Sequence, residues 1–139
     1  MTDASSALHL PRAIVNQLLD HARHSPAHEI CGLISARDGK PARCIRITNV
    51  ATSPACRYAM DPREQIDALR EMREHGETLY AIYHSHPSSP AAPSTIDIRE
   101  AGYPEAHYLI ISLNTKGVLE MRGFHIAADT VVELVLELE

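Results

Sequence analysis

Residues 84–97 of this chain read HSHPSSPAAPSTID, and they decide how the rest of the sequence is interpreted. They follow LYAIY at residues 79–83, an apolar run rich in aromatic and β-branched residues that is typical of a buried strand. Side chains at positions i and i+2 of a strand point to the same face, so His84 and His86 face the same way with Cα atoms roughly 7 Å apart. Two imidazoles in this arrangement can converge on one metal ion.

A short helix is predicted to begin near the end of the same stretch. Its three prolines prevent a continuing strand or helix and indicate a stiff, irregular loop. Ser94 then has the form of a helix N-cap, which puts Asp97 in the first turn, where it can face back toward the histidines. His84, His86 and Asp97 make three protein ligands and leave a fourth position for water, which is the ligand count of a catalytic zinc site.

Simpler interpretations of these residues are available. Ser94 and Asp97 also fit a plain capping box, whose pattern is Ser or Thr followed three residues later by an acid or amide. A pair of histidines at a strand end is often no more than a surface feature. Together, in one short segment, the two features favour a metal site.

The spacing within this segment resembles the JAMM metalloprotease motif, also called MPN+. In that motif His-Ser-His-Pro is followed by a serine and then an aspartate, at the separations that Ser94 and Asp97 have here. The family also has a glutamate on an early strand, and Glu29 in HEICGLI, residues 28–34, matches it in context. By itself, Glu29 would be read as a surface carboxylate at a strand edge. The resemblance extends from Leu10 to the final strand.

The resemblance implies a role for each of these residues. One zinc ion per chain is held by His84, His86 and Asp97, and a zinc-bound water is the nucleophile. Glu29 is the general base that takes the proton of this water. Ser94 donates a hydrogen bond to the oxyanion that forms.

The resemblance also implies a substrate class. Eukaryotic deubiquitinating members carry insertions around the core, whereas this chain is close to a minimal domain and is more similar to the stand-alone prokaryotic members. Those are associated with ubiquitin-like sulfur-carrier proteins. We therefore expect hydrolysis of a peptide or isopeptide bond at the C-terminal tail of such a carrier. The sequence identifies no substrate-binding residue.

Other functions remain open at this point. An MPN domain can be a non-catalytic scaffold or binding module, although scaffold members usually lack part of the metal set. Two histidines and one carboxylate can also hold Fe²⁺ for oxygen chemistry. A zinc deaminase is disfavoured, because the His-x-Glu and Pro-Cys-x-x-Cys elements of that chemistry are missing.

Composition narrows the partners and the compartment. The 139 residues carry 13 Lys and Arg against 18 Asp and Glu, and the net charge of −5 argues against nucleic acid or an anionic membrane as a partner. No apolar run reaches the length of a membrane span, and no signal peptide is visible. The three cysteines cannot all pair and lack zinc-ribbon spacing, so a reducing cytoplasm is the simplest compartment.

The remaining histidines and cysteines are given structural interpretations. His21 and His24, three apart on a predicted helix, are assigned to its solvated face. Cys31 is interpreted as a small buried hydrophobe. His107 and His125 lie on strands away from the metal segment, and no function is assigned to either.

Periodicity and turn residues predict one domain over residues 1–139 with an α/β fold. We expect a mixed, mostly antiparallel sheet flanked by helices, and this order resembles the cytidine-deaminase-like architecture of MPN domains. Exposed edge strands would permit a homodimer. The expected elements are a loose start at 1–9, helices at 11–24, 62–75 and 95–101, strands at 29–36, 43–50, 79–86, 106–113, 118–126 and 130–139, and a turn at 114–117. Helical spacing puts the apolar Ile66, Leu69 and Met72 on the buried face of the helix at 62–75.

Overall fold

The structure is a computed structural model, and it describes residues 7–114 and 119–139. Most of the turn predicted at 114–117 lies outside the described residues. Apart from the short strand at Ala7–Leu10, the elements follow the predicted order, and the final segment is a strand as predicted. They are β1 (Ala7–Leu10), α1 (Arg12–His24), β2 (Cys31–Arg37), β3 (Lys40–Ile47), α2 (Pro62–Glu74), β4 (Thr78–His86), α3 (Thr95–Glu100), β5 (His107–Ser112), β6 (Glu120–Ala127) and β7 (Thr130–Leu138).

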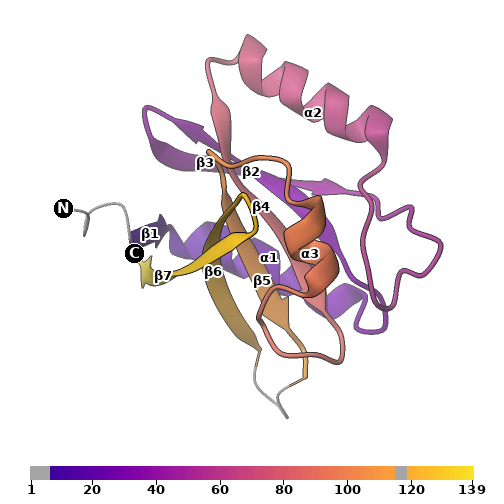
Figure 1. Ribbon diagram of the computed structural model, residues 1–139. Coiled ribbons are helices and arrows are strands. Elements are labelled where there is room, and N and C mark those ends of the chain that lie inside the picture. The colour runs from indigo at the N-terminus through magenta and orange to yellow at the C-terminus, as the bar shows by residue number, and fades with distance from the viewer. Residues whose placement is uncertain (1–6, 115–118) are drawn as a thin grey trace.

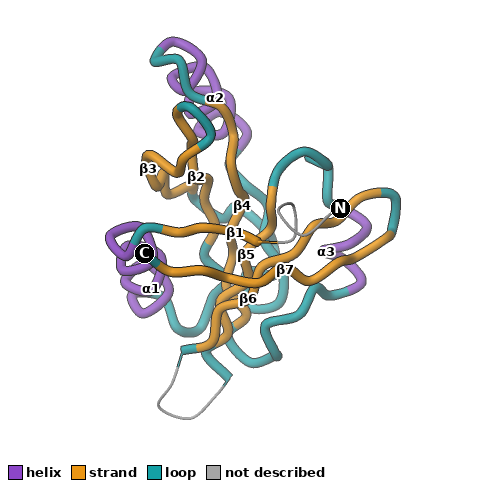
Figure 2. The backbone as a smooth tube through the Cα atoms, turned by 90° about the vertical axis from the view of Figure 1, so that its left-hand side faces the viewer, coloured by secondary structure: helices purple, strands orange, loops and turns teal. Residues whose placement is uncertain are grey.

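The described strands form one seven-stranded sheet in the order β1-β7-β6-β5-β4-β2-β3. Two neighbouring pairs, β1 with β7 and β4 with β5, are parallel, and the other four pairs are antiparallel. This confirms the predicted mixed, mostly antiparallel sheet. Helix α1 covers one face and α3 the other, while α2 packs at one end of the molecule (Figures 1 and 2). No helix in the described ranges is long and apolar enough to cross a membrane.

Alternation along the strands gives the sheet two apolar layers. On the α1 face, Leu109 and Ile111 of β5 pack with the buried side of α1. On the opposite face, Tyr108 and Ile110 pack with Ala68 and other residues of α2 and α3. Because successive side chains of a strand point to opposite faces, one apolar strand serves both layers. The second layer borders the segment that carries the paired histidines.

Tyr83 ties α1 to the central strands. Its side chain is fully buried on the α1 face, and its hydroxyl oxygen lies 2.8 Å from Nδ1 of His21. Gly32 is opposite Tyr83 in the β2–β4 register, and a Cβ atom at that glycine would lie 2.4 Å from the tyrosine ring. The position therefore requires glycine. His21 is thus partly buried and bonded to Tyr83, so its assignment to a solvated face was wrong.

The expectation of a loose start is wrong for residues 7–9. These residues belong to β1, which pairs in parallel with β7 so that Ala7 lies opposite Val135 and Leu10 opposite Leu138. Leu8 and Leu10 are fully buried. A strand this short has too little periodicity to be recognised, and burial against distant residues supplies its stability.

Two further expectations differ in detail. Ile66, expected on the buried face of α2, is 57% exposed, whereas Ala68 and Met72 are buried. Glu29 was expected inside a strand, but β2 begins only at Cys31. Its main chain is bonded to a loop instead of the sheet, with the Glu29 amide donating to the carbonyl oxygen of Pro54 at 2.7 Å.

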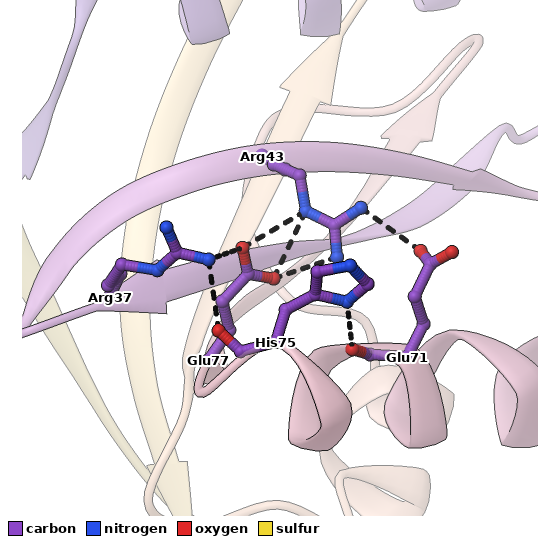
Figure 3. A network of polar contacts seen from close by, with 5 residues as sticks. All are labelled: Arg37, Arg43, Glu71, His75 and Glu77. Carbon is purple, nitrogen blue, oxygen red and sulfur yellow. Dashed lines mark hydrogen bonds and ion pairs between the residues drawn. The ribbon is translucent and has the colours of Figure 1, made fainter.

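A buried carboxylate joins the β2–β3 hairpin to the end of α2 (Figure 3). The side chain of Glu77 is only 3% exposed and accepts hydrogen bonds from the Arg43 guanidinium, the shortest at 2.7 Å. Arg37 adds a longer contact to Glu77 and donates to the carbonyl oxygen of His75 at 2.9 Å. Arg43 also reaches Glu71 at 3.0 Å. A carboxylate buried this deeply is stable only because charged donors surround it.

Candidate metal centre

The three residues predicted to bind zinc converge at the end of β4. Nε2 of His84 and Nε2 of His86 lie 3.1 Å apart, and Oδ2 of Asp97 lies 3.2 Å from the first and 3.0 Å from the second. The side chains are 1%, 3% and 8% exposed. They come together because His84 and His86 share a strand face, while the proline-rich loop returns the chain and places α3 beside the sheet (Figure 1).

The separation of these three atoms suits a tetrahedral zinc ion. Two ligands bound at the usual zinc distances with a tetrahedral angle between them are roughly 3.3 Å apart. The observed separations of 3.0–3.2 Å are only slightly smaller. Two imidazole nitrogens and one carboxylate oxygen form a donor set that zinc commonly takes in catalytic sites.

The hydrogen bonding of His86 leaves two acceptor atoms facing each other, an arrangement that a cation between them would stabilise. Nδ1 of His86 lies 2.7 Å from the carbonyl oxygen of Pro90, which can only accept, so Nδ1 carries the hydrogen. In a neutral His86, Nε2 is then a lone pair that faces the carboxylate oxygen of Asp97 at 3.0 Å. Two acceptors at this distance require a proton or a metal ion between them.

The pKa shifts of Asp97, His84 and His86 reflect their burial and their proximity to one another. Burial opposes ionisation of Asp97, but hydrogen bonds with His84 and His86 outweigh it and hold the pKa of that carboxyl far below its usual range. Burial lowers the pKa of His84. For His86 burial acts in the same direction, but the contacts with Asp97 and the Pro90 carbonyl overcome it and raise its pKa. An ionised carboxylate beside a neutral His84 is the protonation pattern that metal ligation needs.

Glu29 is a second carboxylate at the centre. It is 4% exposed, and one of its oxygens lies with ligand nitrogens of His84 and His86 in a group whose members are within 4.8 Å of one another. Its Oε1 has no hydrogen-bond partner among the described residues. Burial raises the pKa of Glu29 to about 7. Geometry thus offers two candidate carboxylates, of which Asp97 makes the short contacts while Glu29 stands back with a free, proton-accepting oxygen.

Ser94 and Asp97 form the capping box that was the simpler alternative. The Ser94 hydroxyl oxygen accepts from the Asp97 amide at 3.0 Å, and the Ser94 amide donates to Oδ2 of Asp97 at 2.9 Å. That same Oδ2 faces both histidines. The cap and the metal interpretation are therefore compatible, because the cap aims the carboxylate at the imidazoles.

The structure adds residues that the sequence did not reveal. The ring of Tyr58 stacks on the His84 imidazole, with centroids 4.4 Å apart and planes inclined by 27°. The Pro90 carbonyl orients His86, and the Ser85 hydroxyl accepts from the Ile30 amide at 2.9 Å, next to Glu29. The contacts of Tyr58 and Ser85 follow no local sequence pattern, because each joins two segments that are distant in sequence.

Cys31 and His107, which carried structural interpretations, have surroundings consistent with them. Cys31 is fully buried with its thiol 3.4 Å from the carbonyl oxygen of Ile47, and burial raises its pKa to about 12. His107 packs its ring against Tyr80 at 4.9 Å. Neither belongs to the group of ligand atoms around His84 and His86.

Comparison with known proteins identifies the family. A family model described as prokaryotic homologs of the JAB domain matches residues 11–123, so this chain belongs to that family, and the JAMM resemblance is confirmed. One similar solved structure is the solution structure of a protein from Desulfitobacterium hafniense. It is 37% identical, with a TM-score of 0.83, and the match covers 94% of this chain and 92% of that one.

Two relatives carry functional names. One is the CysO-cysteine peptidase of Mycobacterium tuberculosis, 35% identical over 122 residues that cover 86% of this chain and 83% of the relative. The other is a desampylase of Haloferax volcanii, 33% identical over 114 residues that cover 78% and 82%. The relatives are thus named as peptidases or desampylases.

Proposed function

We propose that this protein is a zinc metallopeptidase. The observation that carries the proposal is the convergence of Nε2 of His84, Nε2 of His86 and Oδ2 of Asp97, with acceptor facing acceptor between His86 and Asp97. These three residues hold one zinc ion per chain. A zinc ion bound there would lower the pKa of its bound water to about 7, and it would polarise the carbonyl group of the substrate.

Glu29 is proposed as the general base. Its unpartnered buried oxygen and its pKa of about 7 suit a group that accepts a proton from water and later passes it to the leaving amine. Burial disfavours the ionised form of Glu29, so uptake of a proton by this carboxylate is favourable. Asp97, whose pKa is strongly lowered, is unsuited to that role.

Ser94 is proposed as a hydrogen-bond donor to the oxyanion. Its oxygen already accepts from the Asp97 amide, which leaves the hydroxyl hydrogen free to donate toward the site. Ser94 is not the nucleophile, because both nearby imidazoles are committed to the metal and to Asp97, and no histidine base remains for it.

The proposed substrate is the C-terminal tail of a ubiquitin-like sulfur-carrier protein, cleaved at a peptide or isopeptide bond. The names of the relatives, a CysO-cysteine peptidase and a desampylase, support this class. The three cysteines are free in the structure, which suits a cytoplasmic protein. A homodimer through edge strands stays a prediction, which light scattering of the purified chain would test.

The deciding experiment combines metal analysis with a cleavage assay. Purified protein should contain about one zinc per chain, and it should trim carrier proteins that bear a C-terminal amino acid or peptide extension, with mass spectrometry identifying the bond. Iron in place of zinc would favour oxygen chemistry instead. If the protein binds no metal even after zinc is added, and cleaves no carrier, a non-catalytic scaffold becomes the favoured function.

A further inference from the structure

Asn49 follows β3, and its side chain makes all four of its possible hydrogen bonds to main-chain atoms. Its Nδ2 donates to the carbonyl oxygens of Glu29 at 2.9 Å and Arg57 at 3.1 Å. Its Oδ1 accepts from the amides of Ala51 and Ala59, both at 3.0 Å. An amide side chain has two N–H groups and two oxygen lone pairs, so these four bonds saturate it. They also determine which end is oxygen, because two carbonyls face one end and two amides face the other.

The Glu29 main chain depends on this loop. Glu29 precedes β2 and has no place in the sheet, and its amide donates to the carbonyl oxygen of Pro54 at 2.7 Å. Its carbonyl oxygen accepts from Asn49. Both main-chain polar groups of the proposed base are therefore held by residues 49–54. The nearest main-chain bond to β4 is at Ile30, one residue further on, whose carbonyl oxygen accepts from the Ser85 amide at 3.0 Å.

The Asn49 side chain also holds the segment whose tyrosine ring stacks on His84. Tyr58 lies between Arg57 and Ala59, whose carbonyl and amide groups are the ones bonded to Asn49. The Tyr58 ring stacks on the His84 imidazole at 4.4 Å. A single side chain thus connects the backbone of the base to the ring that packs on a metal-binding imidazole.

We propose that Asn49 is a positioning residue for the hydrolysis, setting the Glu29 carboxylate relative to His84 by joining the two segments that carry Glu29 and Tyr58. The expected effect on the rate of hydrolysis rests on the proposed function. The expected displacement of the Glu29 carboxylate can be tested without any enzymatic activity. In the described part of the chain, the hydrogen bonds of the Asn49 side chain reach neither the metal ligands nor the carboxylate of Glu29.

Two substitutions separate the halves of this side chain. Asn49→Asp keeps acceptors for Ala51 and Ala59 and loses the donor to Glu29 and Arg57, whereas Asn49→Ala loses both. With zinc-loaded protein and a carrier that bears a C-terminal peptide extension, kcat should fall about 10- to 100-fold in both variants, because small displacements of catalytic groups cost this much. KM should stay within about threefold and zinc near one per chain, since neither substitution removes a binding contact.

Thr48→Val is the matched control. Thr48 is the preceding residue, and its hydroxyl donates to Glu64 Oε2 of α2 at 2.9 Å, so this variant loosens the same loop without touching the Glu29 or Arg57 carbonyl. Its kcat should stay within about twofold of wild type. If Asn49→Ala melts at a lower temperature but keeps wild-type kcat, or if it loses zinc, the positioning role is overturned.

A crystal structure of the Asn49→Asp or Asn49→Ala variant gives a readout independent of turnover. A Glu29 carboxylate displaced relative to His84 supports the inference, and an unmoved carboxylate overturns it. If wild-type protein cleaves no carrier, the proposed function fails, while the position of Glu29 in the variant still decides the role of Asn49. If Asn49→Ala does not fold, Asn49→Asp supplies both measurements.

Discussion

Ser94 and Asp97 bond to each other twice, and the second bond orients a proposed metal ligand. The Ser94 oxygen accepts from the Asp97 amide at 3.0 Å, while the Ser94 amide donates to Oδ2 of Asp97 at 2.9 Å. A helix cap thereby holds a carboxylate oxygen within 3.2 Å of two imidazole nitrogens. Stability of α3 and formation of the metal centre depend on the same two residues.

Asp97→Asn separates these two roles. An asparagine oxygen can still accept from the Ser94 amide, so the cap should survive and the melting temperature should change little. The negative charge is lost, and bound zinc measured by elemental analysis should fall to a small fraction of one per chain. Asp67→Asn, at an exposed pair with Arg70, is the control and should keep its zinc. Full zinc in Asp97→Asn would remove Asp97 from the ligand set.

Glu29→Gln should abolish turnover and leave zinc bound. The amide is the same size but cannot accept the proton, and loss of a general base typically costs about 10²- to 10⁴-fold in rate. Because burial raises the pKa of Glu29 to about 7, removing its charge should not lower the melting temperature. Glu100→Gln, at an exposed carboxylate paired with Arg57, is the control. Near-normal turnover in Glu29→Gln would contradict the assignment.

Removal of metal should destabilise the protein. A chelator would leave the Nε2 lone pair of His86 against the Asp97 carboxylate at 3.0 Å, so a proton must replace the ion there. The melting temperature, followed by differential scanning fluorimetry, should fall with chelator and rise again when zinc is added, because a ligand that binds only the folded state stabilises it. His84→Ala should show neither change. Identical curves for wild type with and without chelator would argue against a metal centre.

His21 should make stability depend on pH between about 6.5 and 4. Burial, with the nearby Arg46 and His24 adding to it and Asp20 opposing it, lowers the pKa of His21 from 6.5 to about 4 in the folded protein. Between these values the unfolded chain binds a proton that the folded chain does not, so stability falls as the pH is lowered through this range. Above about 6.5 the contribution is fully present.

The variant His21→Gln tests this dependence. Glutamine does not titrate and can still bond the Tyr83 hydroxyl, so its denaturation curves should lose part of the pH dependence seen in wild type between pH 6.5 and 4. The measurement is urea denaturation at a series of pH values in both proteins. Parallel pH profiles for the two would show that His21 takes up its proton equally in the folded and unfolded states.

Arg43→Met should destabilise the fold more than a comparable surface change. It leaves Glu77, whose side chain is 3% exposed, with the longer Arg37 contact at 3.4 Å as its remaining ion pair among the described residues. An unpaired buried carboxylate is costly, so the melting temperature should fall by several degrees. The control is Arg46→Met, which breaks an exposed pair with Asp20 at 3.3 Å and should have little effect. Equal effects would mean that Glu77 is adequately solvated.

The motif in residues 84–97 predicted the convergence of His84, His86 and Asp97. It could do so because the rules that position these side chains act over a few residues. His84 and His86 share a face because of strand geometry, and Asp97 is aimed by a cap that spans three residues. Both rules operate over a few residues. The positions of the helices and of most strands followed in the same way from periodicity and turn residues, whereas the order of the strands in the sheet did not.

The parts that escaped prediction depend on distant contacts. Asn49 and Tyr58 matter through bonds and stacking with Glu29 and His84, which no spacing rule encodes. Ile66 was assigned to the core because it is apolar, yet the turn of α2 carries it to the exposed side. The four residues of β1 acquire their structure from a partner at the other end of the chain.

That partnership has a consequence for synthesis of the protein. In the described part of the chain β1 pairs only with β7, so the main-chain hydrogen bonds of β1 within the sheet form only after Val135 to Leu138 have been made. At roughly 5–20 residues per second, many seconds pass between translation of the two strands. During that interval Leu8 and Leu10 can pack only against nearby segments such as α1, and they become fully buried when β7 joins the sheet.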